Sequence, residues 1–365
     1  MKKNKLYIIS LISFLFIHFS YSQDKLNLGV IGLVHDHVNW ILNYKSENLK
    51  IVGIVEKNVN SINRYKKKYN LPDSIFFDTM NDLYNKRKVD AVTAFNSTYD
   101  HLKVVKFFAP KGIHIMVEKP LSVNYEIAKE MDSIAKKYNI SLLVNYETSW
   151  YESTYHSKTL IDNGKIGILN KLVFNTGHQG PIEIGCTSEF LEWLTDPVLN
   201  GAGALTDFGC YGANISTWLL DGEKPLSVSC IAKSIKKEKY PLVDDDTTII
   251  LNYEKKKVII NASWNWPYNR KDMQIYGDKG YINAIDNKKM EFIKREYTSL
   301  KKITPPKISY ERKDPFLLLY KVVKENYKLK PFSLYSIENN LIVSKILDLA
   351  LKSSNQGKTV LWNED

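Results

Sequence analysis

Residues 26–37 read LNLGVIGLVHDH, which is a short apolar run followed by a glycine turn and two histidines. The apolar run predicts a buried strand over residues 26–31, and the apolar spacing over residues 38–44 predicts a helix directly after the turn. A strand, a tight glycine turn and a helix in this order are typical of the first unit of a nucleotide-binding sheet. This stretch therefore decides which fold to expect for the first half of the chain.

The alternation of strand and helix continues well beyond this first unit. Further short strands are predicted over residues 51–55, 74–77, 91–95, 113–117 and 141–144, with helices between them. Strands that alternate with helices of this length form a parallel, doubly wound sheet. We therefore expect an α/β protein whose N-terminal Rossmann domain, residues 24–147, binds a dinucleotide.

The pattern changes after about residue 150. Predicted strands now follow one another with few helices between them, over residues 172–175, 226–231, 247–253, 258–264 and 273–276. This run indicates a C-terminal domain of α+β type, residues 148–365, with a largely antiparallel open sheet. One internal helix is expected over residues 204–219, and a final amphipathic helix over residues 336–351 can pack back on the first domain.

The first 22 residues have the pattern of a secretory signal peptide. Three lysines precede an apolar run over residues 6–19, and small residues follow before Gln23. The run is shorter than the roughly 20 apolar residues that span a bilayer. We therefore expect a cleaved signal over residues 1–22, an exported, periplasmic protein and no stable membrane anchor, with an uncleaved anchor as the alternative.

The composition is that of an ordinary globular protein. Hydrophobic residues make up 44% of the 365 residues and charged residues 25%, which allows a core to form and argues against a disordered chain. The formal net charge of +11 comes largely from short lysine clusters that are scattered and interrupted by acids. Because these clusters are not interleaved with aromatic residues and match no nucleic-acid module, no nucleic-acid partner is expected.

The turn after the first strand departs from the usual dinucleotide fingerprint. That fingerprint would place glycines at positions 32, 34 and 37, but only Gly32 is present, with Val34 and His37 at the other positions. His35 and His37 are candidates for contacting phosphate instead, as donors at a helix N-terminus. Glu56 lies 24 residues after Gly32, where an acid can accept hydrogen bonds from the adenosine ribose. Such an acid would repel a 2′-phosphate, so NAD is favoured over NADP.

The same two histidines permit a different interpretation. His35 and His37, one residue apart after a first strand, resemble the metal-binding pair of the amidohydrolase barrels, and imidazoles are good zinc ligands. That fold requires eight strand–helix units with further ligands at later strand ends, whereas the alternation here stops near the middle of the chain. A metal-dependent hydrolase is therefore a remote alternative, and no metal ligand is assigned.

The sharpest chemical signal is the sequence Val117-Glu118-Lys119-Pro120 at the end of a predicted buried strand. Ligands of open parallel sheets bind at the carboxyl ends of the strands. A lysine there, partly desolvated and beside a nucleotide, can have its pKa lowered towards neutrality and exchange a proton with a substrate hydroxyl. Lys119 is therefore a candidate catalytic residue, and Glu118 is placed beside the cofactor.

Residues 201–214 read GAGALTDFGCYGAN and include the start of the internal helix of the second domain. Asp207, Tyr211 and Asn214 stand at positions i, i+4 and i+7, so they are expected to share one face of that helix. A polar stripe on such an apolar helix is either a solvent face or the wall of a site. Tyr146, just after the last predicted Rossmann strand, is a candidate for lining the substrate side of that site.

Three motifs together resemble the Gfo/Idh/MocA family, which contains glucose-fructose oxidoreductase and inositol dehydrogenase. They are Glu-Lys-Pro after the fifth strand, Asn96 with His101 after the fourth strand, and the motif at residues 201–214. The resemblance covers nearly all of the chain after the signal, and it is specific in combination. It implies a nicotinamide cofactor and a sugar or sugar derivative as substrate, with Asn96 and His101 beside the cofactor.

The resemblance also implies roles in the chemistry. The lysine of Glu-Lys-Pro is catalytic in the family, and the second-domain motif supplies an aspartate and, four residues on, a histidine or tyrosine. Lys119, Asp207 and Tyr211 are the matching positions. The tyrosine version, followed by Asn214 as a substrate-binding residue, is closer to the glucose-fructose oxidoreductase branch. The open sheet often forms a dimer face in the family, which implies a homo-oligomer.

The expected activity is that of an exported NAD(P)-dependent oxidoreductase that transfers a hydride between a sugar carbon and nicotinamide, with Lys119 moving the hydroxyl proton. Because an exported enzyme leaves the cytosolic nucleotide pool behind, its NAD is expected to be tightly bound and regenerated within one catalytic cycle. Two further alternatives stay open. One is a redox-assisted glycoside-cleaving enzyme of the same family, and the other is a cofactor-less sugar-binding protein.

Overall fold

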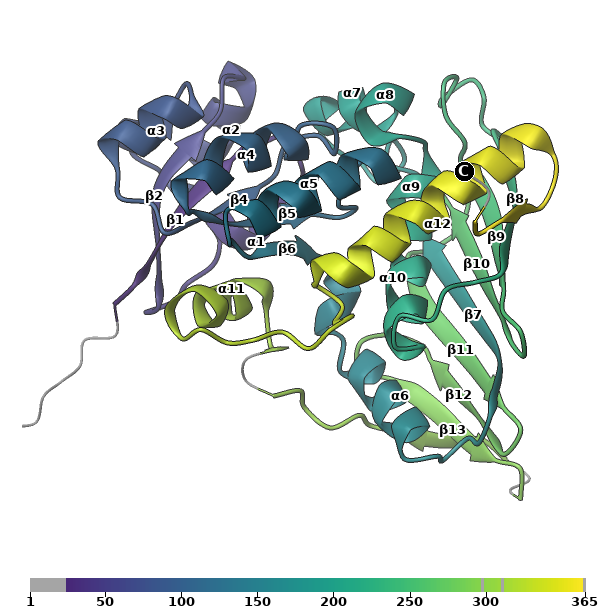
Figure 1. Ribbon diagram of the computed structural model, residues 1–365. Helices are drawn as coiled ribbons and strands as arrows, with labels where there is room; N and C mark the ends of the chain where they lie inside the picture. The colour runs from purple at the N-terminus through teal and green to yellow at the C-terminus, as the bar shows by residue number, and fades with distance from the viewer. Residues whose placement is uncertain (1–23, 297–298, 310–311, 364–365) are drawn as a thin grey trace, which may run out of the picture.

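The computed structural model describes residues 24–296, 299–309 and 312–363. These residues form two sheets with helices packed on them (Figure 1). The predicted signal peptide, residues 1–22, lies outside the described residues. Within the described part of the chain, no helix combines the length and the apolar character that crossing a membrane requires.

The first sheet has six strands in the order β3-β2-β1-β4-β5-β6, all parallel. The strands are β1 (Leu26–Ile31), β2 (Leu49–Val55), β3 (Phe76–Phe77), β4 (Ala91–Ala94), β5 (His114–Glu118) and β6 (Leu142–Asn145). The chain reverses its direction of winding between β1 and β4, and sheets of this kind bind ligands at that point. The predicted parallel Rossmann sheet is therefore confirmed.

Helices and short 3-10 turns connect or follow these strands. They are α1 (Val38–Leu42), α2 (Val59–Tyr69), η1 (Asp73–Ile75), α3 (Met80–Lys86), α4 (His101–Phe108), η2 (Ala109–Lys111), α5 (Tyr125–Lys137) and η3 (Glu147–Trp150). The side chain of Asn124 accepts the main-chain N–H of Ile127 and so caps α5 at its N-terminus. The helices start where the sequence predicts a change from strand to helix.

The second sheet has nine strands in the order β14-β13-β12-β11-β7-β10-β9-β8-β15. The strands are β7 (Leu169–Gly177), β8 (Ser227–Lys233), β9 (Asp246–Asn252), β10 (Lys257–Ser263), β11 (Arg270–Gly277), β12 (Gly280–Ala284), β13 (Met290–Lys294), β14 (Lys301–Ile303) and β15 (Val360–Leu361). All neighbouring pairs are antiparallel except β7 with β10. The expected largely antiparallel sheet is confirmed, although the sequence does not predict β12, β13 and β14.

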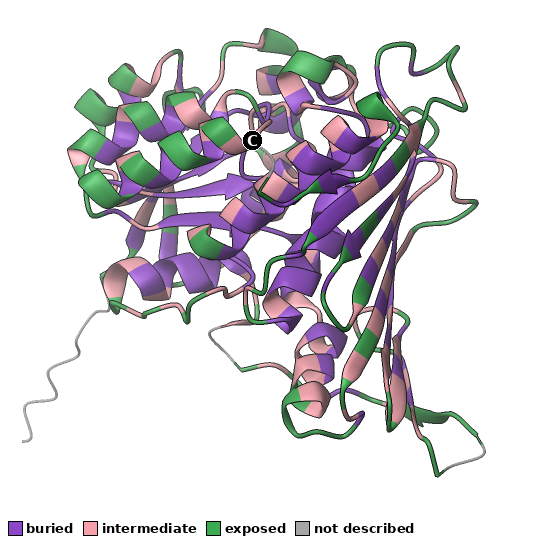
Figure 2. Ribbon diagram, turned by 45° about the vertical axis from the view of Figure 1, so that its right-hand side comes forward, coloured by how far each residue is buried: buried purple, intermediate pink, exposed green. Residues whose placement is uncertain are grey.

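The second half of the chain contains more helices than the sequence predicts. They are α6 (Glu152–Asp162), α7 (Ser188–Leu194), α8 (Pro197–Asn200), α9 (Ala204–Asp207), α10 (Gly209–Leu219), α11 (Pro315–Lys324) and α12 (Ile337–Gln356). The last helix, α12, packs against α10 and β8 of the second domain and against α5 and β6 of the first. Figure 2 shows that the strands of the first sheet and the inner side of α12 are mainly buried, that strands of the second sheet alternate buried with partly buried or exposed residues, and that the outer faces of the helices are exposed.

The predicted single helix over residues 204–219 is wrong, because the chain breaks at Phe208 into α9 and α10. The main-chain carbonyl of Asp207 accepts a hydrogen bond from the ammonium group of Lys119 at 3.0 Å. The carbonyl of Phe208 accepts one from the hydroxyl of Thr176 at 2.9 Å. Side chains of other elements thus satisfy the carbonyl groups at the break, and Asp207 ends a short helix.

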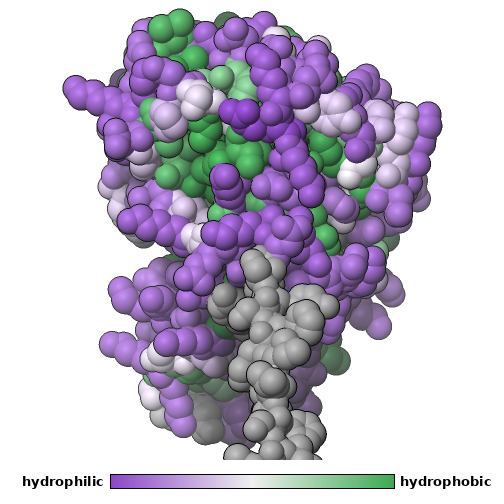
Figure 3. All heavy atoms as spheres, turned by 90° about the vertical axis from the view of Figure 1, so that its left-hand side faces the viewer, coloured by the Kyte–Doolittle hydropathy of each residue, from purple (hydrophilic) through white to green (hydrophobic). Residues whose placement is uncertain are grey.

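The surface on the side of the Rossmann domain is mainly polar. Figure 3 shows hydrophilic residues over most of this face, surrounding a smaller hydrophobic area. Exposed ion pairs such as Lys66–Asp73 and Lys106–Glu130 neutralise part of the lysine charge. The lysine clusters of the sequence therefore belong to a solvated surface of mixed charge.

Candidate active site

The site is built around an ion pair between Lys119, which directly follows β5, and Asp207, the last residue of α9. The two side chains are only 5% and 6% exposed. The second carboxylate oxygen of Asp207 accepts the indole N–H of Trp264 at 2.9 Å. Both oxygens of the carboxylate are thus engaged, and the ammonium group of Lys119 is fixed at the carboxyl edge of the first sheet.

The ion pair sets the protonation state of both groups. Burial lowers the pKa of Lys119, but the adjacent Asp207 carboxylate together with other neighbours raises it by more, so the pKa lies above its ordinary value. Burial raises the pKa of Asp207, and Lys119 together with other neighbours lowers it by more. The expected shift of the Lys119 pKa towards neutrality is therefore wrong, because the counter-charge outweighs desolvation. At neutral pH the pair consists of an ammonium and a carboxylate.

Aromatic rings pack around the ion pair. The rings of Phe208 and Tyr211 stack with their centroids 5.8 Å apart, and the ammonium nitrogen of Lys119 lies 5.3 Å from the Tyr211 centroid. The ring of Tyr146 packs edge-on against Tyr211 at 5.6 Å. Burial raises the pKa of both tyrosines, so their hydroxyl groups stay protonated and can donate hydrogen bonds. The structure thus brings these two tyrosines to the Lys119–Asp207 pair.

Two side chains that the sequence does not single out also reach this cluster. His178, directly after β7, packs edge-on against Phe208 at 4.9 Å, and burial lowers its pKa to about 4, which leaves it neutral. Lys271 of β11 lies 5.3 Å from the Tyr211 ring and forms an ion pair with Glu147. The position of His178 at the carboxyl end of a strand is the sequence signal that points to it.

The turn after β1 keeps the first glycine of a dinucleotide site. Gly32 has a φ of +85°, and a Cβ atom there would lie 2.8 Å from the main-chain nitrogen of Asn96, so no larger residue fits without strain. Glu56, directly after β2, accepts the main-chain N–H groups of Leu33 and Lys57, each at 2.7 Å. Glu56, which the sequence predicts to accept hydrogen bonds from the ribose, therefore also stabilises the turn.

His35 lies under the turn as a buried, neutral side chain. It is 1% exposed, and its Nδ1 accepts the main-chain N–H of His37 at 3.1 Å. Because burial lowers its pKa well below the ordinary value, the ring carries one proton, which lies on Nε2. That Nε2 is buried and has no hydrogen-bond partner among the described residues. Buried polar groups are normally paired, so this N–H is available to a bound ligand.

Two other buried polar atoms near this edge of the sheet lack partners within the described ranges. They are Oδ1 of Asn96, which follows β4, and Nε2 of His101, in the first turn of α4. The other ring nitrogen of His101 bonds the carbonyl of Leu121 at 3.1 Å, and burial lowers the pKa of the ring to about 4. These unpaired atoms, together with Gly32 and Glu56, fit a dinucleotide bound along the carboxyl edge.

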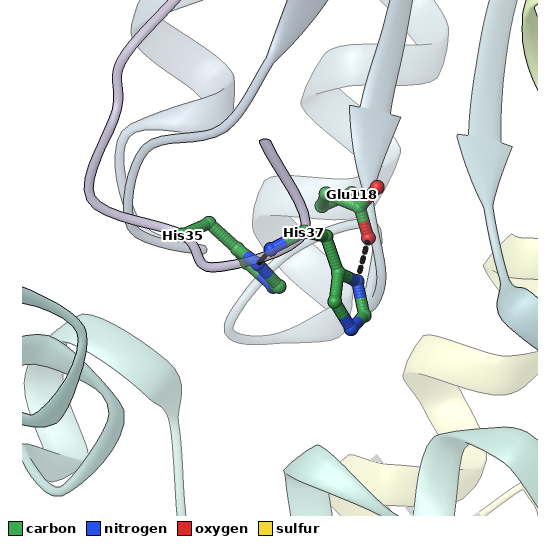
Figure 4. Close-up of side chains that lie close together, drawn as sticks. All are labelled: His35, His37 and Glu118. Atoms are coloured by element: carbon green, nitrogen blue, oxygen red, sulfur yellow. Dashed lines mark hydrogen bonds and ion pairs between the residues drawn. The ribbon is translucent and has the colours of Figure 1, made fainter. Parts of the chain in front are cut away.

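His35, His37 and Glu118 form a compact cluster at the same edge (Figure 4). One ligand atom of each lies within 4.8 Å of the others, which makes this the group in the described part of the chain that could hold a metal ion. However, Nδ1 of His37 bonds the Glu118 carboxylate at 2.9 Å, and the other carboxylate oxygen accepts the amide of Asn145 at 2.6 Å. Both oxygens of Glu118 and Nδ1 of His37 are therefore engaged within the protein, whereas Nε2 of His35 has no partner among the described residues, and the ring of His37 turns its Nε2 away from Glu118.

Two predicted site residues take part in packing. Val34 packs against the core, and its carbonyl accepts a hydrogen bond from α7. Asn214 is fully buried, and its amide donates to the carbonyl of Leu334 at 2.8 Å, which ties α10 to the segment before α12. Because the chain breaks at Phe208, the single helical face predicted for Asp207 and Asn214 does not exist.

Two cavities share the side chains of Glu147 and Tyr151, and they adjoin the ion-pair cluster through Lys271 rather than being lined by Lys119 or Asp207. One, of about 660 Å³, is lined in part by Lys271. The other, of about 570 Å³, is lined in part by Trp40, which stacks on His37 with ring centroids 3.9 Å apart. Volumes of this size hold small-molecule ligands, so these cavities are the candidate substrate space.

Comparison with known proteins identifies both halves of the chain. A family model described as "Oxidoreductase family, NAD-binding Rossmann fold" matches residues 26–146. A second model, described as "GFO/IDH/MocA C-terminal domain", matches residues 155–283.

Curated relatives are similar over part of their length. Trans-1,2-dihydrobenzene-1,2-diol dehydrogenase of Xenopus laevis is 26% identical over 214 residues, which are 59% of this chain and 60% of that protein. D-xylose 1-dehydrogenase (NADP(+)) of Haloarcula marismortui is 26% identical over 180 residues, which are 49% of each chain. The chain thus matches between about half and three fifths of the length of these two relatives.

Solved structures match over nearly the whole chain. The aldose-aldose oxidoreductase from Caulobacter crescentus, complexed with glycerol, has a TM-score of 0.76 at 17% identity and covers 92% of this chain and 99% of its own. An inositol dehydrogenase homolog from Azotobacter vinelandii, complexed with NAD+, has a TM-score of 0.78 at 14% identity, with coverages of 93% and 98%. At these identities the likeness shows a common fold. With both domains matched by the family's own models, the chain belongs to the Gfo/Idh/MocA family of oxidoreductases, and its first domain is an NAD-binding Rossmann domain.

Proposed function

We propose that this protein is an NAD-dependent oxidoreductase that moves a hydride between a hydroxyl-bearing carbon of a sugar or sugar derivative and the cofactor. The observation that carries the proposal is the buried Lys119–Asp207 pair, which lies at the carboxyl edge of a dinucleotide-binding sheet. When bound, the nicotinamide supplies the hydride acceptor or donor. The chain's own residues position the substrate and move a proton.

Lys119 is the proton-transfer group in this proposal. As an ammonium it donates a hydrogen bond to the substrate oxygen and stabilises the negative charge that develops there. In the oxidation direction the lysine must first release its own proton before it accepts that of the hydroxyl. Asp207, held on its other oxygen by Trp264, orients the ammonium group and raises its pKa.

Tyr146 and Tyr211 are the neutral donors beside the lysine. The hydroxyl of Tyr146 is buried and has no hydrogen-bond partner among the described residues. Because the pKa of Tyr146 is raised by burial, this hydroxyl keeps its proton and can donate it to a sugar oxygen. Tyr211 lies between the Lys119 and Lys271 ammonium groups and the Tyr146 ring, where it can assist the proton transfer.

A sugar substrate is supported by the lining of the larger cavity. It combines the aromatic rings of Tyr151 and Tyr268 with the charged groups of Glu147, Arg270 and Lys271. Flat rings and many hydrogen-bonding groups suit a polyhydroxylated ring. The names of two similar proteins, a D-xylose dehydrogenase and an aldose-aldose oxidoreductase, support the same class.

NAD rather than NADP is the proposed cofactor, with Glu56 beside the ribose. Arg64, the nearby cation that would suit a 2′-phosphate, is instead bonded to both carboxylate oxygens of Glu189 at 2.8 Å. The charge of Arg64 is thus balanced by Glu189 through Nη2, while its Nη1 has no hydrogen-bond partner among the described residues. The NAD is proposed to be tightly bound.

Export and assembly complete the proposal. A signal cleaved after Ser22 gives a periplasmic protein that begins at Gln23, which N-terminal sequencing of the secreted form tests.

The uncovered face of the second sheet exposes Ile231 and Ile250, which supports a homo-oligomer formed through that face. Light scattering of the purified protein measures the assembly.

The activity is tested with a panel of sugars and glycosides, each incubated with the protein and NAD or NADP. Formation of oxidised or reduced sugar, followed by mass analysis and by nicotinamide absorbance, supports the proposal if Lys119→Met abolishes it. Lys158→Met is a matched control, because Lys158 pairs with Asp221 outside the site. Cleaved glycoside would identify the redox-assisted glycoside-cleaving enzyme, and sugar binding by a protein that binds no nucleotide would identify a sugar-binding protein.

A further inference from the structure

A third cavity, of about 450 Å³, lies apart from the candidate substrate space. Its walls come from α6, from the C-terminal end of α10, from α11, from residues 306–309 and 312, and from residues 327–335 before α12. It shares no lining residue with the two cavities of the substrate space. In Figure 1 the helices α6, α10 and α11 lie below α12. We call this space the α6–α11 cavity, and its volume is that of a small-molecule site.

Aromatic side chains form one wall of the α6–α11 cavity. Tyr155 of α6 packs edge-on against Trp218 of α10, with ring centroids 5.3 Å apart. The hydroxyl of Tyr155 bonds that of Tyr335, whose own hydroxyl donates to the carbonyl of Ser149 at 3.1 Å. These contacts hold the rings in place, so the wall is pre-organised for a ligand.

A single aromatic layer separates this cavity from the substrate space. The ring of Tyr335 stacks on that of Trp150, with centroids 4.7 Å apart. Tyr335 lines the α6–α11 cavity, whereas Trp150 lines the substrate cavity of about 570 Å³. A ligand in one cavity would therefore contact different side chains from a ligand in the other, and substitutions can distinguish the two.

The lining of the α6–α11 cavity carries an excess of positive charge. The ammonium group of Lys158 bonds Asp162 at 2.9 Å and Asp221 at 2.8 Å, which accounts for both acids of the lining. Three further cations of the lining have no carboxylate partner in the described part of the chain. They are Lys307, Arg312 and Lys330. An anionic ligand would supply the missing counter-charge.

Arg312 is the best placed of these cations because it lies against the aromatic wall. Its guanidinium carbon is 5.3 Å from the centroid of the Tyr155 ring, and the residue is half-buried. A guanidinium that rests on a ring keeps its donors in its own plane, where two of them match the two oxygens of a carboxylate. Such paired, charge-assisted hydrogen bonds are stronger than neutral ones.

The rest of the lining suits a ligand with several hydroxyl groups. Thr159, Ser309 and Tyr327 contribute hydroxyls, which can both donate and accept hydrogen bonds. Two other lining residues carry buried polar atoms that have no hydrogen-bond partner among the described residues, namely Nδ1 of His156 and Oγ of Ser333. Because buried polar groups are normally paired, this lining favours a hydroxylated ligand over a purely apolar acid.

We propose that the α6–α11 cavity is a second ligand site, which binds a sugar acid. The carboxylate lies on Arg312, and the hydroxyl-bearing ring lies against Tyr155 and Trp218. Lys307 and Lys330 are exposed and attract the anion to the cavity. Binding is non-covalent and does not depend on the activity proposed above.

Titration calorimetry of the purified protein with sodium glucuronate tests this site. Glucose is the uncharged counterpart of the same ring, and sodium acetate supplies the carboxylate alone. Glucuronate should bind about tenfold more tightly than either, because only glucuronate pairs with Arg312 and also fills the aromatic and polar lining.

Substitutions locate the bound acid. Arg312→Met should weaken glucuronate binding about tenfold or more. Lys307→Met changes an exposed side chain, so the fold is retained, and it should weaken binding about twofold. Lys271→Met removes a cation of the substrate space and should leave this binding unchanged. Lys106→Met, which breaks the exposed Lys106–Glu130 pair on the first domain, is the matched control and should bind like the wild type.

Three results would overturn the proposal. The first is wild-type protein that does not bind glucuronate. The second is binding that Lys271→Met abolishes and Arg312→Met leaves intact, since the acid would then occupy the substrate space. The third is glucose or acetate that binds as tightly as glucuronate, because either would show that the cavity does not recognise a sugar acid.

Discussion

Lys119 binds Asp207 twice, once through its carboxylate and once through its main-chain carbonyl at 3.0 Å. The first contact sets the charge of the lysine, and the second helps to break the helix that would otherwise run through residue 208. One ammonium group therefore joins the two domains at the point where the chemistry is proposed. Removing it would affect stability as well as activity.

Lys119→Met should abolish turnover and destabilise the protein. The loss of activity follows from removal of the proton-transfer group, which contributes about a factor of 100 or more. The buried Asp207 would lose its counter-charge, which costs about 3–5 kcal/mol. Rate measurements and urea unfolding check both effects. The double variant Lys119→Met/Asp207→Asn should regain much of the stability and none of the activity, and a near-wild-type rate in the single variant would contradict the role.

The stabilising effect of the pair should vary with pH in a defined way. The folded pKa of Asp207 lies below its ordinary value of 3.8, so its contribution is present above that value and is lost as the pH falls through the folded pKa. The folded pKa of Lys119 lies above 10.5, so its contribution is present below 10.5 and is lost as the pH rises through the folded pKa. Urea unfolding should therefore show a constant difference between wild type and the double variant from roughly pH 5 to 9. A difference that changes within that range would be inconsistent with the ion pair.

Tyr211→Phe should reduce the rate by about tenfold, which is less than the effect of Lys119→Met. The variant keeps the aromatic ring that lies 5.3 Å from the Lys119 nitrogen and removes only the hydroxyl. A water molecule can replace part of that hydroxyl's hydrogen bonding. Steady-state kinetics decide the ranking, and a loss equal to that of the lysine variant would make Tyr211 an equal partner in proton transfer.

NAD should bind more tightly than NADP. Glu56 provides a carboxylate next to the ribose, and Arg64 is occupied by Glu189. Fluorescence titration with both reduced nucleotides measures the preference. Glu56→Gln should narrow it, because the charge that repels a 2′-phosphate is removed while a hydrogen-bonding oxygen remains. Tighter binding of NADPH by the wild type would reverse the assignment.

Chelation should leave activity and thermal stability unchanged. In the one metal-like cluster of the described residues, His35, His37 and Glu118, the Nδ1 atoms of both histidines and the Glu118 carboxylate already have hydrogen-bond partners within the protein. Elemental analysis of the purified protein and an assay after dialysis against EDTA test this. A stoichiometric metal that is lost together with activity would revive the metal-dependent hydrolase that the paired histidines first suggest.

The parts of the fold that could be predicted are those that a short stretch of neighbouring residues determines. The run of residues 26–32 shows a buried strand and a glycine turn, and the alternation of strand and helix after it requires a parallel sheet. Lys119 could be placed at the carboxyl edge for the same reason, because it ends a short apolar run. The meeting of Lys119 with Asp207 is not local, and only the resemblance to a family suggested it.

The predictions that the structure contradicts depend on residues that are far away in the sequence. The helix break at Phe208 depends on Thr176, 32 residues away, and on Lys119, 88 residues away from Asp207. The pKa of Lys119 was predicted in the wrong direction because its counter-charge comes from that same distance in sequence. The seven-residue helix α7 is too short to show a clear period, and its Glu189 and Trp193 bond to Arg64 and Val34 across the domain boundary.

The last helix has a consequence for how the molecule behaves as a whole. Asp348 of α12 accepts the main-chain N–H of Tyr125 in α5 at 2.7 Å, while Asn339 donates to the carbonyl of Asn214 in α10 at 3.2 Å. Since one helix completes the apolar interior on both sides, neither half keeps its interior intact once the other has melted. We therefore expect the two halves to unfold as one cooperative unit, in a single calorimetric transition.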